Sequence, residues 1–293
     1  MPDIAETLKQ AAEVLRINEI AEPRREANSL LALALQKDHT FLIAHPEYEL
    51  TEDEQKLFAE NLRRRAAREP FQYIAGHQEF YGLDFMVTPD VLIPRPETEM
   101  TVETAIELFK DKGDLFFCEI GVGSGCISIS ILHEITNARA IGFDVSQKAL
   151  DVAERNAYRN NVADRLELGI SDVFSHMFSV VDTSLQFDLV VSNPPYIPLE
   201  DFATLQPEVR DHEPASALTD NGDGLSIIEK IIDQAPNFLK TGGYLLMEIG
   251  IDQAIPVGNM IDRDIWQTFE IIPDLRGIPR MVKLQKSNEL AMS

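Results

Sequence analysis

Four consecutive residues combine an amide, two prolines and an aromatic ring: Asn193, Pro194, Pro195 and Tyr196. They follow residues 187–192, an apolar run that predicts a buried strand. Two adjacent prolines cannot continue a strand, because proline lacks the amide hydrogen and fixes φ. These four residues, here named the ledge, therefore predict a rigid turn at the carboxyl end of a strand, where open α/β sheets bind ligands. The Asn193 side chain and the Pro194 carbonyl are suited to hold a planar NH2 group under the Tyr196 ring.

A glycine-rich loop lies upstream of the ledge. It consists of Gly121, Val122, Gly123, Ser124 and Gly125, between an apolar strand and a predicted helix. Glycines allow backbone turns closed to other residues and let a ligand lie against bare main chain, and a helix amino terminus offers free amide hydrogens. The spacing Gly-x-Gly-x-Gly differs from the dinucleotide fingerprint Gly-x-Gly-x-x-Gly. It matches the S-adenosylmethionine loop of Rossmann-like methyltransferases.

Two carboxylates follow the next two predicted strands. Asp144 ends the strand over residues 138–144, near the distance from a glycine loop at which a carboxylate reaches a ribose. A helix cap is the competing role for Asp144, and we favour the ligand role. Asp172 is suited to accept a hydrogen bond from the adenine amino group. Val173 and Phe174 are expected to pack on the face of the adenine ring. Loop, carboxylates and ledge thus follow four successive strands in the order such a site requires.

The amino-terminal part of the chain predicts a separate helical domain over residues 1–70. Apolar residues recur at helical spacing, and Thr51 is a predicted helix cap with an acidic first turn after it. The helix from Thr51 ends in the densest basic cluster of the chain, formed by Arg63, Arg64, Arg65 and Arg68. We interpret this cluster as a solvated helix end rather than a nucleic-acid patch, since cations are favourable at a helix carboxyl end.

Residues 71–92 predict a β-hairpin linker with Gly82 at its centre, and residues 93–293 predict the α/β domain that carries the site. In the segment Ile93–Glu99, Pro94 and Pro96 predict a rigid extended entry, and Arg95, Glu97 and Glu99 concentrate charge in it. These charges either form a structural salt-bridge set, which we slightly favour, or line a cleft.

Charge and composition narrow the class of protein. Lys and Arg number 26 against 49 Asp and Glu, a formal net charge of −23. A protein that grips a long polyanion needs a basic surface, so we expect no stable nucleic-acid binding. No apolar stretch reaches the length of a membrane span and no signal pattern opens the chain, which predicts a cytoplasmic protein. Cys118 and Cys126 are predicted to be reduced thiols, and no metal-ligand spacing occurs.

The motifs together closely resemble one family, the peptide-chain release factor glutamine methyltransferases (HemK/PrmC family). The resemblance covers nearly the whole chain. It rests on the segment Ile93–Glu99, on the ledge with its flanking Ser192 and Ile197, and on the stretch Gly222–Leu225. The ledge alone is shared with amino-group methyltransferases that act on DNA or RNA, whereas the other two motifs make the match specific.

The resemblance implies a Rossmann-like class I S-adenosylmethionine-dependent methyltransferase domain with a helical substrate-recognition domain before it. The reaction it implies is methylation of the Gly-Gly-Gln glutamine side chain in class 1 release factors, leaving S-adenosylhomocysteine. Asn193, Pro194 and Tyr196 would be catalytic, the whole ledge would bind substrate, and Asn193 would also border the cofactor. We expect a monomer. The alternatives are an adenine-N6 or guanine-N2 methyltransferase on nucleic acid and a non-catalytic cofactor-binding protein.

The chain departs from the family pattern in a few places. The family usually has Asp where Glu119 stands, Thr where Val122 stands and an aromatic residue where Val173 stands. None of these differences removes a glycine of the loop. The segment 175–184 is predicted to be longer than usual.

Overall fold

The protein is described by a computed structural model that covers residues 2–175 and 186–288. Apart from Ser175, the segment expected to be longer than usual lies outside these residues. The chain forms two compact units. The helical unit contains residues 1–76 together with Gln206–His212, and the larger unit contains the remaining residues from His77 onward.

The helical unit is built from short amphipathic helices. They are α1 (Ile4–Ile17), α2 (Pro23–Leu35), α3 (His39–Ala44), α4 (Glu52–Ala66), α5 (Phe71–Ala75) and the single turn α11 (Pro207–Arg210). The predicted cap at Thr51 is confirmed. Its hydroxyl accepts from the amide of Glu54 while the Glu54 carboxylate accepts from the amide of Thr51, a capping box that satisfies two donors at the start of α4. Apolar faces of α1, α2 and α4 share one buried core around Leu30 and Leu31.

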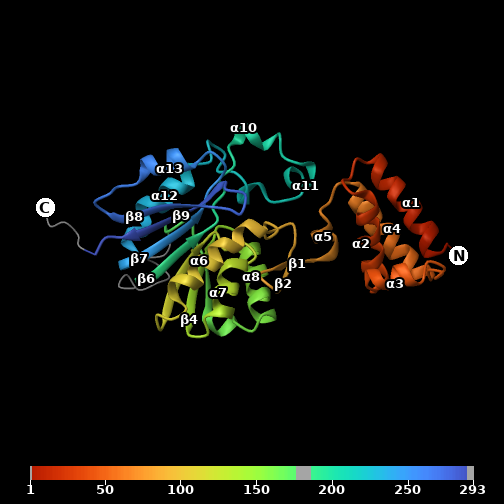
Figure 1. Cartoon of the computed structure of the whole chain (residues 1–293), viewed down its shortest axis with the longest axis horizontal. Coiled ribbons are helices and arrows are strands. Elements are labelled where there is room, and N and C mark those ends of the chain that lie inside the picture. The colour runs from red at the N-terminus through yellow and green to blue at the C-terminus, as the bar shows by residue number, and fades with distance from the viewer. Residues whose placement is uncertain (1, 176–185, 289–293) are drawn as a thin grey trace. The chain divides into compact units, whose positions relative to one another are not determined.

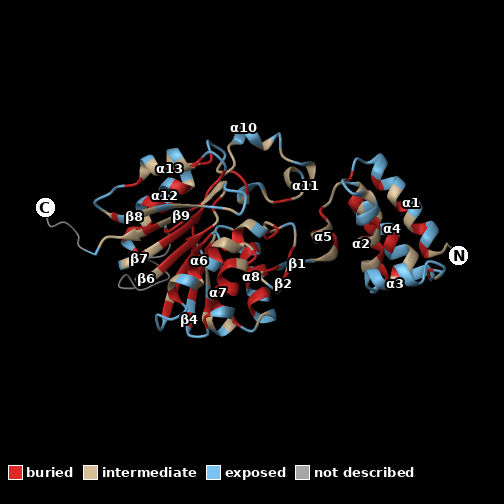
Figure 2. Cartoon of the chain, viewed as in Figure 1, coloured by how far each residue is buried: buried red, intermediate tan, exposed pale blue. Residues whose placement is uncertain are grey.

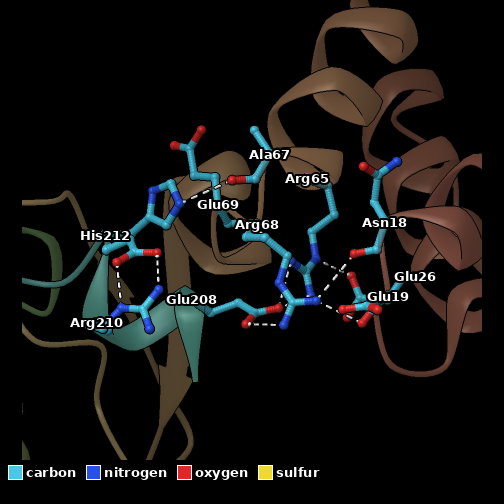
Figure 3. Close-up of polar contacts among 11 residues, drawn as sticks. Asn18, Glu19, Glu26, Arg65, Ala67, Arg68, Glu69, Glu208, Arg210 and His212 are labelled. Atoms are coloured by element: carbon cyan, nitrogen blue, oxygen red, sulfur yellow. Dashed lines mark hydrogen bonds and ion pairs between the residues drawn. The ribbon is translucent and has the colours of Figure 1, made fainter. Parts of the chain in front are cut away.

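The basic cluster at the end of α4 is a solvated helix end only at Arg63, which is exposed, and the expectation was wrong for Arg65 and Arg68. Arg65 is only 6% exposed and pairs with Glu26 (2.9 Å) and with Glu208 (3.2 Å). Arg68 reaches the second carboxylate oxygen of Glu208 at 3.0 Å (Figure 3). A buried guanidinium needs paired acceptors, and Glu208 supplies them from a segment 140 residues farther along the chain.

The larger unit opens with a two-stranded antiparallel hairpin, β1 (His77–Phe80) and β2 (Leu83–Met86), which confirms the predicted hairpin. A mostly parallel seven-stranded sheet follows, with spatial order β5-β4-β3-β6-β7-β9-β8. The strands are β3 (Leu115–Ile120), β4 (Ala138–Asp144), β5 (Leu166–Ile170), β6 (Phe187–Ser192), β7 (Leu239–Glu248), β8 (Trp266–Pro273) and β9 (Pro279–Lys286). The last three strands pair antiparallel, with β9 between β7 and the edge strand β8.

Helices cover both faces of this sheet (Figure 1). One face carries α6 (Glu99–Phe109), α7 (Cys126–Glu134) and α8 (Gln147–Arg159), and the other carries α12 (Ser226–Gln234) and α13 (Ala254–Met260). Short turns complete the unit: η1 (Pro96–Thr98), η2 (Ala163–Arg165), α10 (Leu199–Phe202), η3 (Ala215–Ala217) and η4 (Ala235–Asn237). The predicted Rossmann-like α/β architecture is confirmed.

Each face of the sheet has its own apolar core, because successive side chains of a strand point to opposite faces. On β3, Leu115 and Phe117 pack with α6, α7 and α8, whereas Cys118 and Ile120 pack with α12 and α13. The central strands are therefore almost wholly buried, and the outer faces of the helices are exposed (Figure 2). Parallel strands buried on both faces are continuous apolar runs in the sequence. For this reason the sequence predicts them.

The sheet order decides where the ligand-binding edge lies. From β3 the chain moves outward through β4 to β5, then returns to place β6 on the other side of β3. This reversal is a topological switch point, where loops from neighbouring strands separate and leave a crevice at the carboxyl ends. Of the helices that the structure describes, none is long and apolar enough to cross a membrane.

Candidate active site

The glycine loop is held in place by the strand beside it. The amides of Gly121 and Val122 both donate to the carbonyl oxygen of Phe143, at 2.8 and 3.0 Å. Gly121 has φ +75°, and a Cβ there would stand 3.9 Å from the carbonyl oxygen of Asn193. The loop after β3 and the ledge after β6 are thus neighbours, as the switch point requires.

Gly125 serves packing rather than the cavity. Its φ is +81°, and a Cβ there would lie 2.8 Å from Cδ1 of Ile129 and 3.4 Å from Cβ of Ala153. This glycine therefore lets the start of α7 lie close to α8. Gly125 does not line the cavity, and a direct cofactor contact from it stays a prediction.

One cavity collects most of the predicted site residues. Its lining includes Gly121, Val122, Gly123, Ser124, Asp144, Asp172, Val173, Asn193, Pro194 and Pro195. Segments far apart in the chain therefore converge on one space.

Tyr196 takes a different position from the rest of the ledge. It does not line the cavity. Its ring packs against the core on the α12 side of the sheet, and its hydroxyl donates to Oε1 of Glu248 at 2.9 Å. Burial raises the pKa of the Tyr196 phenol, as does the carboxylate of Glu248, so the hydroxyl stays a donor. The expected contact of the ring with substrate remains a prediction.

Asp144 joins the glycine loop to the next helix. Its Oδ2 accepts from the amide of Gly123 and its Oδ1 from the amide of Ser146, both at 2.9 Å. The cap of α8 is Ser146, whose hydroxyl accepts from the amide of Ala149. Asp144 is therefore not that cap, and its carboxylate oxygens keep lone pairs for a ribose hydroxyl. Burial raises the pKa of Asp144, against the effect of the amide hydrogen bonds.

Asp172 and Val173 lie together at the cavity, but Phe174 does not. The Phe174 ring stacks on Phe238 inside the core, with centroids 4.7 Å apart, so the expectation that it packs on the adenine was wrong. Val173 has φ +51°, a conformation that is strained for a β-branched residue. In this backbone conformation the Val173 side chain lies at the cavity while the Phe174 ring turns into the core.

The ledge amide has a defined orientation. Nδ2 of Asn193 donates to Oγ1 of Thr98 at 3.1 Å, and Oγ1 of Thr98 donates to Oε2 of Glu248 at 2.7 Å. The amide nitrogen is thus engaged by the protein, which leaves the amide oxygen as the acceptor for a ligand. The sequence assigned no role to Thr98 or Glu248, although Thr98 stands inside the segment Ile93–Glu99 that carries the family resemblance.

The charged segment before α6 combines both roles that the sequence left open. Arg95 lines the cavity and also pairs with Glu213 at 2.5 Å. Glu213, which is 5% exposed, accepts from the amide of Ile93 as well. Glu99 instead accepts from the amide of Tyr81. A carboxylate therefore anchors the segment that forms one wall of the cavity.

Comparison with known proteins places this site in a family. Residues 6–76 match the PrmC N-terminal domain, and residues 111–263 match a methyltransferase domain. The release factor glutamine methyltransferase of Koribacter versatilis is 42% identical over 280 residues, covering 94% of this chain and 97% of that protein. The chain belongs to the release factor glutamine methyltransferase family. The enzyme of the same name from Geobacter sulfurreducens is 40% identical, covering 90% and 89% of the two chains.

The fold agrees with this family. A methyltransferase from Pyrococcus furiosus superposes with a TM-score of 0.52 at 18% identity, covering 78% of this chain and all but 1% of that one. A methyltransferase domain of this class uses S-adenosylmethionine, and the cavity fits it: glycines open the main chain beside Asn193, and Asp144 and Asp172 supply acceptors. Across residues 2–175 and 186–288, no group of three His, Cys, Asp or Glu side chains is placed to hold a metal ion.

Proposed function

We propose that this protein transfers the methyl group of S-adenosylmethionine to the side-chain nitrogen of the glutamine in the Gly-Gly-Gln motif of class 1 release factors. The observation that carries the proposal is the ledge amide of Asn193, whose nitrogen is held by Thr98 beside the glycine loop of a methyltransferase domain. The two relatives compared above are named release factor glutamine methyltransferases, which supports the proposal.

The residues that would bind the cofactor and the substrate lie at the carboxyl ends of four strands. The glycine loop Gly121–Gly125 would receive the main body of the cofactor, Asp144 its ribose and Asp172 with Val173 its adenine. S-adenosylmethionine supplies an electrophilic methyl group on a positively charged sulfur. The residues of the ledge would present the acceptor on the other side of that methyl group.

An amide nitrogen is a poor nucleophile, because its lone pair is delocalised into the carbonyl. Positioning therefore has to supply most of the acceleration. Oδ1 of Asn193 and the carbonyl oxygen of Pro194 would accept hydrogen bonds from the two N–H groups of the glutamine amide. These two bonds would orient its nitrogen. The same two acceptors would stabilise the positive charge that develops on the nitrogen during transfer. The proton leaves after the transfer, so no strong base is required.

The substrate assignment is tested with labelled S-adenosylmethionine and three acceptors. They are a purified class 1 release factor, the same factor with Gly-Gly-Gln changed to Gly-Gly-Ala, and DNA or ribosomal RNA. We expect label on the unaltered release factor alone. Label on nucleic acid, or equal label on the Gly-Gly-Ala factor, would overturn the proposal.

The role of the ledge is tested with Asn193→Ala. We expect turnover to fall by at least about 100-fold, the scale seen when one preorganised hydrogen-bonding group is lost. Binding of S-adenosylmethionine, measured by calorimetry, should be retained in part, because the glycine loop and carboxylates are untouched. Full activity of this variant would contradict the mechanism.

A further inference from the structure

A buried carboxyl group, Glu248, stands next to the ledge without a role in the mechanism above. It ends β7, and in the sheet β7 pairs with β6, which leads into the ledge. Glu248 is 3% exposed, and each of its oxygens accepts a hydroxyl hydrogen: Oε2 from Thr98 at 2.7 Å and Oε1 from Tyr196 at 2.9 Å. Both hydroxyls belong to segments that border the site.

The chain of hydrogen bonds has a direction, and the carboxylate sets it. Both oxygens of Glu248 accept a hydrogen bond, and the one hydroxyl hydrogen of Thr98 points to Oε2. The lone pairs of that hydroxyl then face Asn193, and only the NH2 end of the Asn193 amide can bond to them. Burial raises the pKa of Glu248, while the hydrogen bonds from Thr98 and Tyr196 and the charge of Arg280 oppose that rise.

We propose that Thr98 and Glu248 are positioning residues that lock the Asn193 amide with its oxygen toward the methyl acceptor. The inference rests on the proposed function, since it explains how the ledge presents an acceptor to an NH2 group. Without the lock, the Asn193 amide is free to turn over about its last bond. It would then direct its own NH2 at the NH2 of the substrate, and donor would face donor.

The lock is rigid because its three residues lie on three separate backbone segments. Thr98 is 2% exposed and closes η1 just before α6, Asn193 follows β6, and Glu248 ends β7. Three separately anchored backbone segments therefore fix one side-chain torsion. In metal sites, removing a side chain that orients a ligand costs about 10- to 100-fold in activity, and we expect a loss on the same scale here.

The test compares Thr98→Val with Thr98→Ser. Valine keeps the shape of threonine and removes the hydroxyl, whereas serine keeps the hydroxyl. With the release factor as acceptor, we expect Thr98→Val to lower kcat by about 10- to 100-fold. Its affinity for S-adenosylmethionine should stay within about twofold, and Thr98→Ser should restore most of the rate.

Thr101→Val is the matched control. Thr101 lies on the following turn, is 1% exposed and donates its hydroxyl to Sδ of Met281 at 3.5 Å, away from the cavity lining. It loses the same atom at a similarly buried position, so its kcat should stay close to that of the wild type. Equal loss in Thr98→Val and Thr101→Val would mean that a buried hydroxyl matters only for packing, and would overturn the lock.

Glu248→Gln tests the proposal even if Thr98→Val folds poorly, and hydrogen exchange in a folded Thr98→Val gives a second readout. Glu248→Gln offers Thr98 a group that can donate as well as accept, so we expect a kcat between those of Thr98→Val and wild type. In the free enzyme, the Asn193 side-chain NH2 signals, assigned by their loss in Asn193→Ala, should exchange with water faster in Thr98→Val. Unchanged kcat in Glu248→Gln or unchanged exchange in Thr98→Val contradicts the proposal.

Failure of the lock and failure of the proposed function are separate outcomes. A wild-type enzyme that leaves the release factor unlabelled overturns the function. A wild-type enzyme that labels it, with Thr98→Val equally fast, overturns the lock alone. Should nucleic acid prove to be the acceptor, the same variants are scored on that NH2 group, and the same rate loss is expected.

Discussion

At the scale of single residues, Glu119 shows how a buried acid can be neutral within an acidic protein. It lies on β3, is 1% exposed, and its Oε2 accepts from the amide of Ser128 at 2.9 Å. Burial raises the pKa of Glu119 to about 8, with a smaller contribution from the charge of Asp144. The hydrogen bond from Ser128 is too weak to offset the desolvation of the charged form.

This pKa predicts a pH dependence of stability. The folded state binds the Glu119 proton more tightly than the unfolded chain does. The stability that this proton contributes is therefore fully present below pH 4.5 and is lost as the pH rises toward about 8. Glu119→Gln stays neutral, and across this range it should gain about 1 kcal/mol of unfolding free energy per pH unit relative to wild type. Urea unfolding of both proteins at several pH values measures this, and a difference that stays constant with pH would contradict it.

At the scale of elements, the turn at residues 220–225 before α12 and the side chain of Gln253 before α13 support the ledge. Nε2 of Gln253 donates to the carbonyl oxygens of Tyr196 (3.0 Å) and Gly224 (3.1 Å). The carboxylate of Asp220 accepts from the amides of Gly222, Gly224 and Ser226 and so fixes the turn. Gly224 therefore lies directly against the ledge.

Gly224→Ala should therefore damage both stability and activity. A Cβ at Gly224 would stand 2.2 Å from the carbonyl oxygen of Tyr196, and the φ of +78° is itself unfavourable for alanine. We expect a loss of about 2 kcal/mol or more in the unfolding free energy, together with slower methyl transfer. Thermal unfolding and the release-factor assay measure the two effects.

Gly222→Ala, two residues earlier, is the control. Its Cβ would meet only the Asp220 side chain, at 3.4 Å, and no positive φ constrains it. This variant should keep most of the stability and rate. Equal losses at the two glycines would show that the close approach to Tyr196 is not the cause.

At the scale of the whole molecule, the chain path is not a simple succession of domains. After Leu205 the chain contributes Gln206–His212 to the helical unit and then returns to the larger unit at Glu213. Glu208 is the ionic centre of that contribution, since it pairs with both Arg65 and Arg68. Arg68 also donates to the carbonyl oxygen of Glu19 at 2.7 Å, so this arginine links the inserted segment to the end of α1.

Glu208→Gln should destabilise the helical unit by about 1–3 kcal/mol, because it leaves the buried Arg65 with fewer charged acceptors. Urea unfolding of the full chain, followed by helical circular dichroism, measures the change. Glu60→Gln removes the partner of the exposed Arg63 on the same helix and should leave the midpoint unchanged. Equal shifts in both variants would show that the Glu208 pairs are no stronger than a surface pair.

The strands, the glycine loop and the ledge can be predicted from the sequence, for local reasons. Apolar runs reveal doubly buried strands, and glycine and proline restrict the backbone whatever surrounds them. These features suffice to predict the fold class and the cavity positions of Asp144, Asp172 and Asn193.

The side chains that hold the ledge could not be predicted, because they come together only in the folded chain. The bonds from Asn193 to Thr98 and from Thr98 to Glu248 join residues 95 and 150 positions apart, and Arg65 meets Glu208 across 143. No periodicity or motif spacing encodes such pairs, because they arise where separate segments meet at a sheet edge or a helix end. Contacts between distant segments also explain why Tyr196 bonds to Glu248 and why Phe174 lies in the core. They likewise explain why Arg65 belongs to an internal ion-pair network.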